Sequence, residues 1–178
     1  MLAHEVAMSE RTLRRAVSQG TIRGTRPSPR KLDLPETERQ YIRRSWPLLS
    51  ALGRALRTEQ DVRFALLFGS ASTGEDTPES DVGLLVDVRC PSLDCIVDLG
   101  TRLTSIVGRR MDIVRLEDAA TAPSFLGEIL VDGRVLVDRE QVWPQLHACS
   151  TALRRTGRQQ EALRVRAALA GIDQFLGA

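Results

Sequence analysis

Residues 64 to 88, FALLFGSASTGEDTPESDVGLLVDV, decide the fold of this chain. Phe64 to Phe68 is a short apolar run of the kind that forms a strand buried on both faces. Val82 to Val86 is a second run of the same type. The polar segment between them is rich in turn formers and predicts a turn or a short helix. The stretch therefore predicts two buried strands joined by a polar connection.

The ends of the two predicted strands carry residues suited to a phosphate ligand. Gly69 and Ser70 follow the first strand, where a glycine lets the backbone approach a ligand closely. Backbone N–H groups and the serine hydroxyl can then bind phosphate oxygens. Asp81 opens the second strand and offers a carboxylate that could hold a divalent metal beside those phosphates.

This spacing resembles the signature of the DNA polymerase beta nucleotidyltransferase superfamily, in particular its minimal nucleotidyltransferase branch. In that signature Gly-Ser precedes Asp-x-Asp on a strand, and a third carboxylate lies on a later strand. Here ten residues separate Gly69-Ser70 from Asp81-Val82-Gly83, and Met111 to Val114 resembles the third strand. The resemblance implies a small α/β palm that transfers a nucleotidyl group from an NTP with two Mg²⁺ ions.

The chain departs from the signature where metal binding is concerned. Gly83 stands in place of the second aspartate, so Asp81 and Asp112 supply two carboxylates where the family has three. Asp87 is a poor substitute, because four residues of strand place it about 13 Å beyond Gly83. Thr73 also stands where members of the family often carry an arginine. We therefore expect weak or absent catalysis, and the sequence leaves open whether the protein is an enzyme.

If the site works, the resemblance assigns a role to each matching residue. Gly69 and Ser70 would bind the triphosphate, and Asp81 would bind metal. Asp112 would bind metal or accept the proton of the attacking hydroxyl; the alternative is a structural acid that caps or forms an ion pair at the strand end. Among the other polar residues of the connection, Ser80 is expected to be a turn residue. Three acids are expected to be solvated, namely Glu75, Asp76 and Glu79.

Composition places the chain among soluble bacterial proteins. Its 178 residues suffice for one ordinary domain or two small ones, and 42% of them are hydrophobic. No run approaches the roughly 18 apolar residues of a membrane span, and the first residues lack the pattern of a signal peptide. We therefore expect a cytoplasmic protein without membrane contact. The strong preference for arginine, with Lys31 as the one lysine, suggests a GC-rich bacterial genome.

The three cysteines do not predict a metal site. Cys90, Cys95 and Cys149 lack CxxC spacing, and neither His4 nor His147 lies at ligand spacing from a cysteine. We expect packed or free thiols in a reducing cytosol.

Charge is divided along the chain. Residues 1–60 hold 12 Arg and Lys against 6 Asp and Glu, a net charge of +6, whereas residues 61–140 hold 8 against 15, a net charge of −7. Residues 141–178 return to a net charge of +3, with 5 against 2. The basic N-terminal part is a candidate for nucleic-acid binding. The acidic middle would need Mg²⁺ to accept an NTP.

The N-terminal residues resemble a helix-turn-helix, which presents its second helix to the DNA major groove. A short amphipathic helix is expected at residues 2–8, and Ser9 is a good N-cap for a second helix that ends at Gly20. Residues 21–34 are rich in Pro, Gly and Arg and predict a cationic arm or wing. The alternatives are a helical cap with solvated arginines and a solvated linker. The candidate DNA-binding residues are Arg11, Arg14, Arg15, Arg23, Arg26 and Arg30.

The remaining patterns complete the expected fold, which is α/β (α+β), a small mixed-sheet palm preceded by a helical module and followed by helices. Residues 1–34 would form the DNA-binding-like module, 35–60 a connecting helix that Pro47 kinks or splits, and 61–140 the nucleotidyltransferase-like domain. Within that domain helices are expected at 93–107 and 123–131, and strands at 111–116 and 134–137. Residues 141–178 would be mostly helical with a break at Gly157, and their arginines are either a second binding surface or a solvated face.

Three functions fit these patterns. The first is an active nucleotidyltransferase that moves NMP from an NTP to a protein, RNA or small molecule. The second is a DNA-binding regulator that keeps the fold as a sensor or dimerisation platform. The third combines them, because minimal nucleotidyltransferases often resemble the antitoxin half of bacterial toxin–antitoxin pairs. The expected partners are DNA, a toxin or other protein, and an NTP with Mg²⁺ if the site is active, while the sequence leaves a homodimer open.

Overall fold

The structure, a computed structural model, describes residues 8–28 and 31–176, with residues 161 and 164–176 described by their backbone alone. In chain order its elements are α2 (Glu10–Gln19), β1 (Thr25–Ser28), β2 (Lys31–Asp33), α3 (Glu36–Thr58), β3 (Val62–Phe68), α4 (Ser70–Thr73), β4 (Val82–Val88), α5 (Leu93–Val107), β5 (Met111–Arg115), α6 (Leu116–Ala120), α7 (Pro123–Asp132), β6 (Arg134–Asp138) and α8 (Val142–Leu176). Among these residues no helix combines the length and the apolarity that a membrane span requires.

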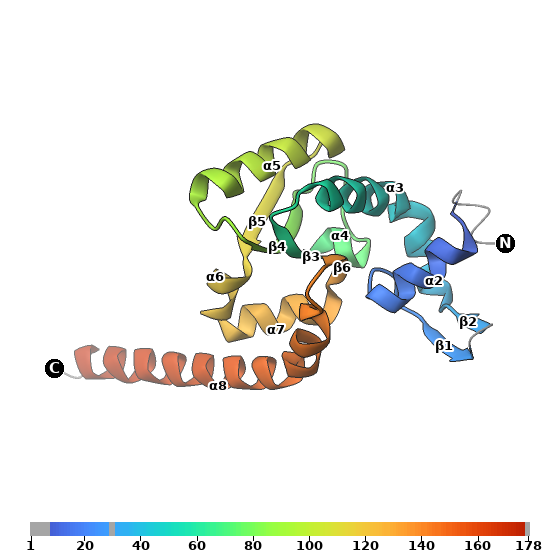
Figure 1. Cartoon of the computed structure of the whole chain (residues 1–178). Coiled ribbons are helices and arrows are strands. Elements are labelled where there is room, and N and C mark those ends of the chain that lie inside the picture. The colour runs from blue at the N-terminus through green and yellow to red at the C-terminus, as the bar shows by residue number, and fades with distance from the viewer. Residues whose placement is uncertain (1–7, 29–30, 177–178) are drawn as a thin grey trace.

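A four-stranded mixed sheet forms the centre of the molecule (Figure 1). Its order is β5-β4-β3-β6, with β4 and β5 parallel and both other pairs antiparallel. The apolar runs at 64–68 and 82–86 form its two central strands, as their composition predicts. The mixed α/β fold class is thereby confirmed.

Helices cover both faces of this sheet, and each face has its own apolar core. Alternate residues of β3 and β4, such as Leu67 and Leu84, pack with α2, α3 and α5. The intervening residues of the same two strands, such as Leu66 and Leu85, point to the other face and pack with α6, α7 and α8. Figure 1 shows α3 and α5 on one side of the sheet and α7 and α8 on the other. This alternation follows from the period of two in a strand and decides which side chains share a face with the candidate site.

The N-terminal elements dock on the β6 edge of the sheet. Ser9 caps α2 by accepting a hydrogen bond from the Thr12 N–H, and Gly20 ends the helix with a φ of 81°, so the predicted helix between them is confirmed. The cationic segment after it forms the antiparallel hairpin of β1 and β2. The Gly20 carbonyl accepts from the Val135 N–H at 3.2 Å, which joins the end of α2 to β6. The helix expected at residues 2–8 lies outside the described residues apart from its last member.

The expected split of the connecting helix at Pro47 and the expected break at Gly157 are wrong. Pro47 lies inside α3, which continues from Glu36 to Thr58 as one helix. Gly157 lies inside α8, and a Cβ at this position would come within 2.3 Å of the Ser124 Cα. The glycine therefore allows α8 to pack closely against α7 and does not end the helix. The short helix α6 was not expected.

The expectation of unpaired thiols is wrong for two of the three cysteines. Cys90 and Cys95 form a disulfide across the turn that enters α5, with their Cα atoms 6.3 Å apart, within the range that a disulfide spans. Ser92 lies within this turn and caps α5, and the local geometry brings the two residues together. Cys149 is free and exposed.

Candidate functional site

Gly69 and Ser70 lie at the end of β3, where the chain turns into the short helix α4. Gly69 has a φ of 75°, a conformation that favours glycine, and no atom lies within 4 Å of a Cβ placed on it. This open approach to the backbone is what the sequence pattern predicts for a residue beside a ligand.

The structure brings the predicted acidic positions to the same end of the sheet. Phe68 at the end of β3 pairs with Gly83 of β4, and Gly83 pairs with Asp112 of β5. Asp81 lies two residues before Gly83 and directly before β4. Side chains two apart on a strand, and side chains directly opposite on paired strands, share a face. Asp81, Gly83 and Asp112 therefore share one face of the sheet, the face that α6 and α7 cover.

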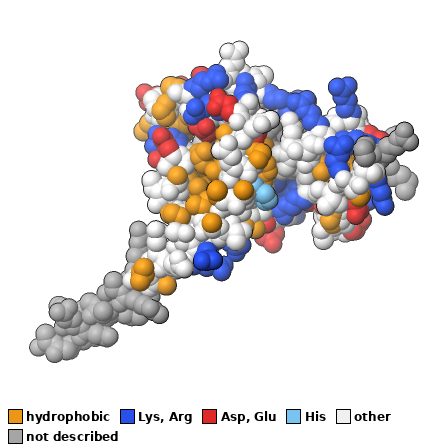
Figure 2. Space-filling model, turned by 60° about the horizontal axis from the view of Figure 1, so that its bottom comes forward, with side chains coloured by type: hydrophobic (Ala, Val, Ile, Leu, Met, Phe, Trp, Pro, Cys, Tyr) orange, Lys and Arg blue, Asp and Glu red, His pale blue; other side chains and the backbone are white. Residues whose placement is uncertain are grey.

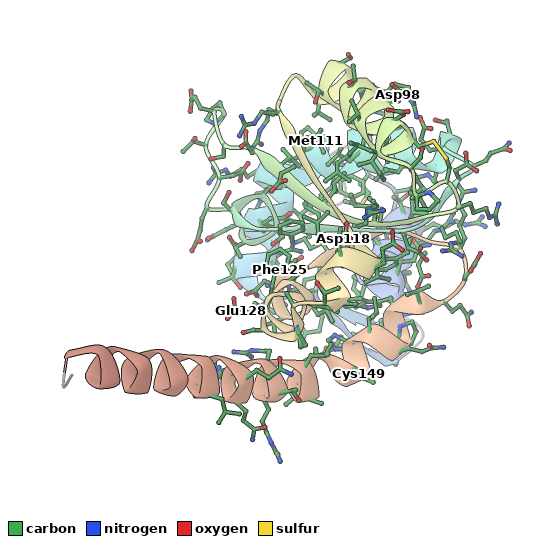
Figure 3. All side chains as sticks on the ribbon, turned by 90° about the vertical axis from the view of Figure 1, so that its left-hand side faces the viewer. Asp98, Met111, Asp118, Phe125, Glu128 and Cys149 are labelled. Carbon is green, nitrogen blue, oxygen red and sulfur yellow. A yellow bond between two sulfur atoms is a disulfide. The ribbon has the colours of Figure 1, made fainter. Side chains whose placement is uncertain are left out.

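Phe68 occupies the space in front of Gly83. A Cβ at residue 83 would lie 2.7 Å from the Phe68 Cε2 atom, closer than side chains pack. The Phe68 ring also meets the Phe125 ring of α7 edge to face, with 6.1 Å between centroids. In Figure 3, Phe125 lies on α7 below the sheet, whereas Asp98 lies on α5 above it. An aromatic ring thus fills the place where a second strand carboxylate would stand.

Arg110 forms an ion pair with Asp81, the acid directly before β4. Its Nε donates to one Asp81 carboxylate oxygen at 2.9 Å, and its Nη2 donates to the other. The hydrogen bond with Asp81 raises the pKa of Arg110, and the charges of Asp81 and Asp112 add to the rise. Forked pairing of this kind satisfies both oxygens of a carboxylate. The positive charge of Arg110 thus stands beside both predicted metal ligands.

These residues do not fit a pair of magnesium ions. Two-metal sites use carboxylates that bridge the ions and offset their repulsion. Here Asp81 is paired with Arg110, Asp112 is the one other acid on this face at the strand ends, and residue 83 has no side chain. Within residues 8–28 and 31–176, no group of three or more His, Cys, Asp or Glu could hold a metal ion.

A buried ion pair supports the turn after Gly69 from behind. Arg134 of β6 donates to both carboxylate oxygens of Glu38 on α3, at 2.5 and 3.0 Å, with side chains 2% and 6% exposed. The Arg134 Nε also donates to the Ser72 carbonyl of α4 at 2.6 Å. Its guanidinium carbon lies 3.4 Å from the centroid of the Tyr41 ring, and the Tyr41 hydroxyl donates to the Ala71 carbonyl at 2.9 Å. Side chains from two distant elements therefore hold the carbonyls of α4 in place.

The loop between α4 and β4 is also held by arginines. Asp76, which we expected to be a solvated acid, is buried and accepts from the Arg109 Nη1 at 2.7 Å. Arg109 also donates to the Ser80 carbonyl, and Arg44 of α3 donates to the Gly74 carbonyl at 2.7 Å. The expectation for Asp76 is wrong because two arginines distant in sequence, Arg44 and Arg109, converge on this loop. Ser80 is a turn residue as predicted, since its hydroxyl accepts from the Thr77 N–H.

The candidate DNA-binding arginines do not form one surface. Arg11 and Arg15 lie on the side of α2 that faces α3. The other described members make contacts within the chain: Arg14 pairs with Glu10, Arg23 donates to the Asp132 carbonyl at 2.6 Å, and Arg26 donates to the Ser18 hydroxyl at 3.0 Å. Arg30 lies outside the described residues. The described members are remote from Asp81 and Asp112, because the N-terminal elements dock at β6 while Asp112 lies on β5, the opposite edge of the sheet (Figure 1).

The sheet order, the Gly-Ser turn after one central strand and the acid before the next define a nucleotidyltransferase fold. The model of the family "Polymerase beta, Nucleotidyltransferase" matches residues 51–142, and the chain belongs to this family. No curated protein matches the chain.

Solved structures with the same fold come from toxin–antitoxin complexes. A chain of a toxin–antitoxin complex with AMP-PNP is 17% identical, with a TM-score of 0.57, and the match covers 68% of this chain and 98% of that one. A chain of the MntA–HepT complex is 14% identical, with a TM-score of 0.53 and shares of 70% and 98%. A chain from the complex of the tri-AMPylated Shewanella oneidensis HEPN toxin with MNT antitoxin is 17% identical, with a TM-score of 0.51 and the same shares. At this level of identity the likeness concerns the fold.

Sequence reasoning missed the residues that modify the site. Arg110 precedes the third strand directly, and because β4 and β5 are parallel, its position beside Asp81 follows once that pairing is known. Phe68 precedes Gly69 and was assigned to the strand alone. Glu38 and Arg134 are 96 residues apart, and a single sequence gives no sign of their contact.

Tyr41 offers a direct test of the support behind α4, because it is the one tyrosine of the chain. Burial raises its pKa from 10.0 to about 12, although the nearby Arg134 charge opposes the rise. Because the folded state holds the proton more tightly than the unfolded state, protonated Tyr41 contributes to the free energy of unfolding. This contribution is complete below pH 10 and is lost as pH rises towards about 12. Ultraviolet titration of tyrosinate in the folded protein should therefore give a pKa near 12.

The variant Tyr41→Phe provides the matching stability measurement. It should cost about 1 kcal/mol at neutral pH through loss of the bond to the Ala71 carbonyl. It should also lack the alkaline decline of the natural protein in denaturant unfolding. A tyrosine that titrates at its ordinary pKa while the protein remains folded would contradict the burial described here.

Proposed function

We propose that this protein is an antitoxin-like regulator, in which a nucleotidyltransferase fold with weak or absent nucleotidyl transfer is joined to a DNA-binding N-terminal segment. The proposal keeps the division into segments 1–34, 35–60, 61–140 and 141–178 and a cytoplasmic location. It retains NTP binding at Gly69 and Ser70 as a property of the fold, in keeping with the AMP-PNP complex among the similar structures. The alternative function is an active nucleotidyltransferase that modifies a protein, RNA or small molecule.

The observation that carries this proposal is that other side chains occupy or pair with the positions expected to bind metal. The ring of Phe68 stands against Gly83, and Arg110 pairs with Asp81. Phe68 leaves an apolar group where a second carboxylate would stand, and the positive charge of Arg110 offsets the negative charge of Asp81. Asp112 alone retains an exposed carboxylate at this end of β5 without a hydrogen bond among the described residues.

The first test is transfer of label from each NTP in the presence of Mg²⁺ or Mn²⁺ and host-cell extract. We expect the natural protein to label no more product than Asp81→Ala, which lacks the strand-end acid. The variant that combines Gly83→Asp with Phe68→Leu restores a carboxylate and the space for it, and we expect it to label more than either. Clear labelling by the natural protein, lost in Asp81→Ala, would favour the active enzyme.

A protein partner is the second part of the proposal. The similar structures are toxin–antitoxin complexes, one of them with a HEPN toxin. On α7 the large apolar side chains of Phe125 and Val131 are 40% and 44% exposed. Figure 2, which brings the bottom of Figure 1 forward, shows apolar side chains gathered at the centre of that face.

We expect the tagged protein to co-purify from its native host with the product of a neighbouring gene. Replacement of Phe125 and Val131 by Ser should weaken the complex, whereas Ser substitution of the exposed Val97 on α5 serves as the matched control. Recovery of the chain from the host as a monomer or homodimer alone would contradict the proposal.

The N-terminal elements support the DNA-binding part. Helix α2 is followed by the β1–β2 hairpin, an arrangement of a helix and a wing, and Arg26 and Lys31 are exposed on the two hairpin strands. Four to six phosphate contacts would give a slope of about −4 to −5 for the logarithm of affinity against the logarithm of salt concentration.

Substitution of both hairpin cations by glutamine should reduce that slope by about 2, since each lost contact removes roughly one counterion. Arg89→Gln is the matched control, because Arg89 is exposed and pairs with Glu140 at the surface, away from the hairpin. Gel-shift or anisotropy measurements over a range of salt concentrations would decide the point. Binding to DNA fragments from the host operon that is absent, or independent of salt, would remove this part of the proposal.

A further inference from the structure

A cavity lies between α2 and α3, separate from the predicted nucleotidyl-transfer site. Its volume is about 520 Å³, within the range that accommodates small-molecule ligands. Helix α2 forms one wall, α3 forms the other, and Leu136 of β6 contributes to the lining between them. The Gly69–Ser70 turn does not contribute to it.

Among the described residues, four arginines line this cavity and no acidic residue does. Arg11 and Arg15 are four positions apart on one face of α2, and Arg54 and Arg57 come from α3. Within residues 8–28 and 31–176 none of the four side chains makes an ion pair or donates a hydrogen bond. Among the described arginines whose side chains do make contacts, nearly all donate to carboxylates or carbonyls, whereas this cavity gathers four that do not.

The cations affect one another. Burial lowers the pKa of Arg57, and the charges of Arg15 and Arg54 lower it further. An anion bound among them would relieve this repulsion, and a guanidinium group can bind two phosphate oxygens at once.

The remaining lining is suited to a ligand of nucleotide size. Gly53 lies in the middle of α3, where glycine costs about 0.5–1 kcal/mol relative to alanine, and a Cβ there would come within 3.3 Å of the Arg57 Nη1. Trp46 presents a half-buried aromatic surface, and Gln19 and Ser50 supply neutral polar groups. The cavity therefore combines positive charge, an aromatic side chain and hydrogen-bonding groups.

We propose that this cavity is a binding site for a small ligand that carries two or more linked phosphate groups. The concave shape between two helices favours a compact molecule over the convex backbone of a duplex. The proposal is independent of nucleotidyl transfer and of DNA binding by the hairpin, since it depends on neither Asp81 nor Arg26 and Lys31. A bound ligand would join α2 to α3 and so fix the N-terminal helix on the rest of the chain.

The test uses the full chain with two probes, ATP and inorganic tripolyphosphate, at fixed ionic strength. Isothermal titration calorimetry measures affinity and stoichiometry. Fluorescence locates the site, because Trp143→Phe leaves Trp46 as the one tryptophan of the chain. We expect saturable binding of at least one probe, with one molecule per chain that changes Trp46 emission. ATP bound at the Gly69–Ser70 turn would add a second site that leaves Trp46 emission unchanged.

The combined variant Arg54→Gln and Arg57→Gln should weaken this binding about tenfold or more, because each lost charged hydrogen bond lowers affinity substantially. Arg89→Gln and Ser70→Ala are controls, the first for a surface arginine and the second for the Gly-Ser turn, and both should retain the Trp46 response. Arg15→Gln from the opposite wall should weaken binding as well, which guards against a local effect on α3.

The two probes distinguish which part of a ligand is recognised. Equal binding of ATP and tripolyphosphate would mean that the phosphate chain suffices, and stronger binding of ATP would mean that the base contributes; both support the site. If neither ATP nor tripolyphosphate binds, the proposal is overturned. Binding that is equal in the natural protein and in the arginine variants, or that gives no change in Trp46 emission, would overturn it as well.

Discussion

The buried contact between Glu38 and Arg134 connects the parts of this structure that are separate in sequence. Glu38 lies in the first turn of α3, Arg134 begins β6, and both side chains are almost fully enclosed. Removal of one partner from such a pair leaves an uncompensated buried charge and typically costs about 3–5 kcal/mol. Glu38 also accepts from the Arg23 N–H at 2.9 Å, so the segment after α2 depends on the same carboxylate. The N-terminal elements, the connecting helix, the sheet and the turn at Ser72 therefore share one polar centre.

This centre holds the Gly-Ser turn in place from the side away from the acidic residues. The carbonyls of Ala71 and Ser72 are bound by Tyr41 and Arg134, which lie behind the turn and away from Asp81. The geometry of the turn thus rests on α3 and β6 and does not require a metal ion or the residue at position 83.

The fold was largely predictable because its signals are local. The apolar runs of β3 and β4, the Ser9 and Gly20 caps and the periodic pattern of residues 93–107 each depend on near neighbours in the chain. The errors arose where tertiary contacts override local preference. Gly157 continues a helix because α7 lies against it, and Asp76 is buried because Arg44 and Arg109 converge on it.

The sequence predicts which residues make up the candidate site, but it does not predict which side chains contact them. The spacing of Gly69, Ser70, Asp81 and Asp112 predicts the candidate site, and the glycine at residue 83 is visible in the sequence. The structure brings Asp81 and Asp112 to the same end of the sheet. That Phe68 fills the gap and Arg110 neutralises Asp81 depends on strand register, which a single sequence does not determine. The arginine-lined cavity was hidden for the same reason, since α2 and α3 approach each other only in the folded chain.

The docking of Gly20 and Thr21 on β6 also determines how this protein can associate. The Gly20 carbonyl accepts a hydrogen bond from the Val135 N–H, and the Thr21 hydroxyl donates to the Val135 carbonyl. Part of that edge of the sheet is therefore paired with the chain itself. The other edge is β5, a strand of five residues that carries charged side chains at Asp112 and Arg115. Short, charged edges resist the addition of a strand from another molecule. Contacts with a second chain are therefore expected to use helical surfaces, and the sheet is protected from growth into aggregates.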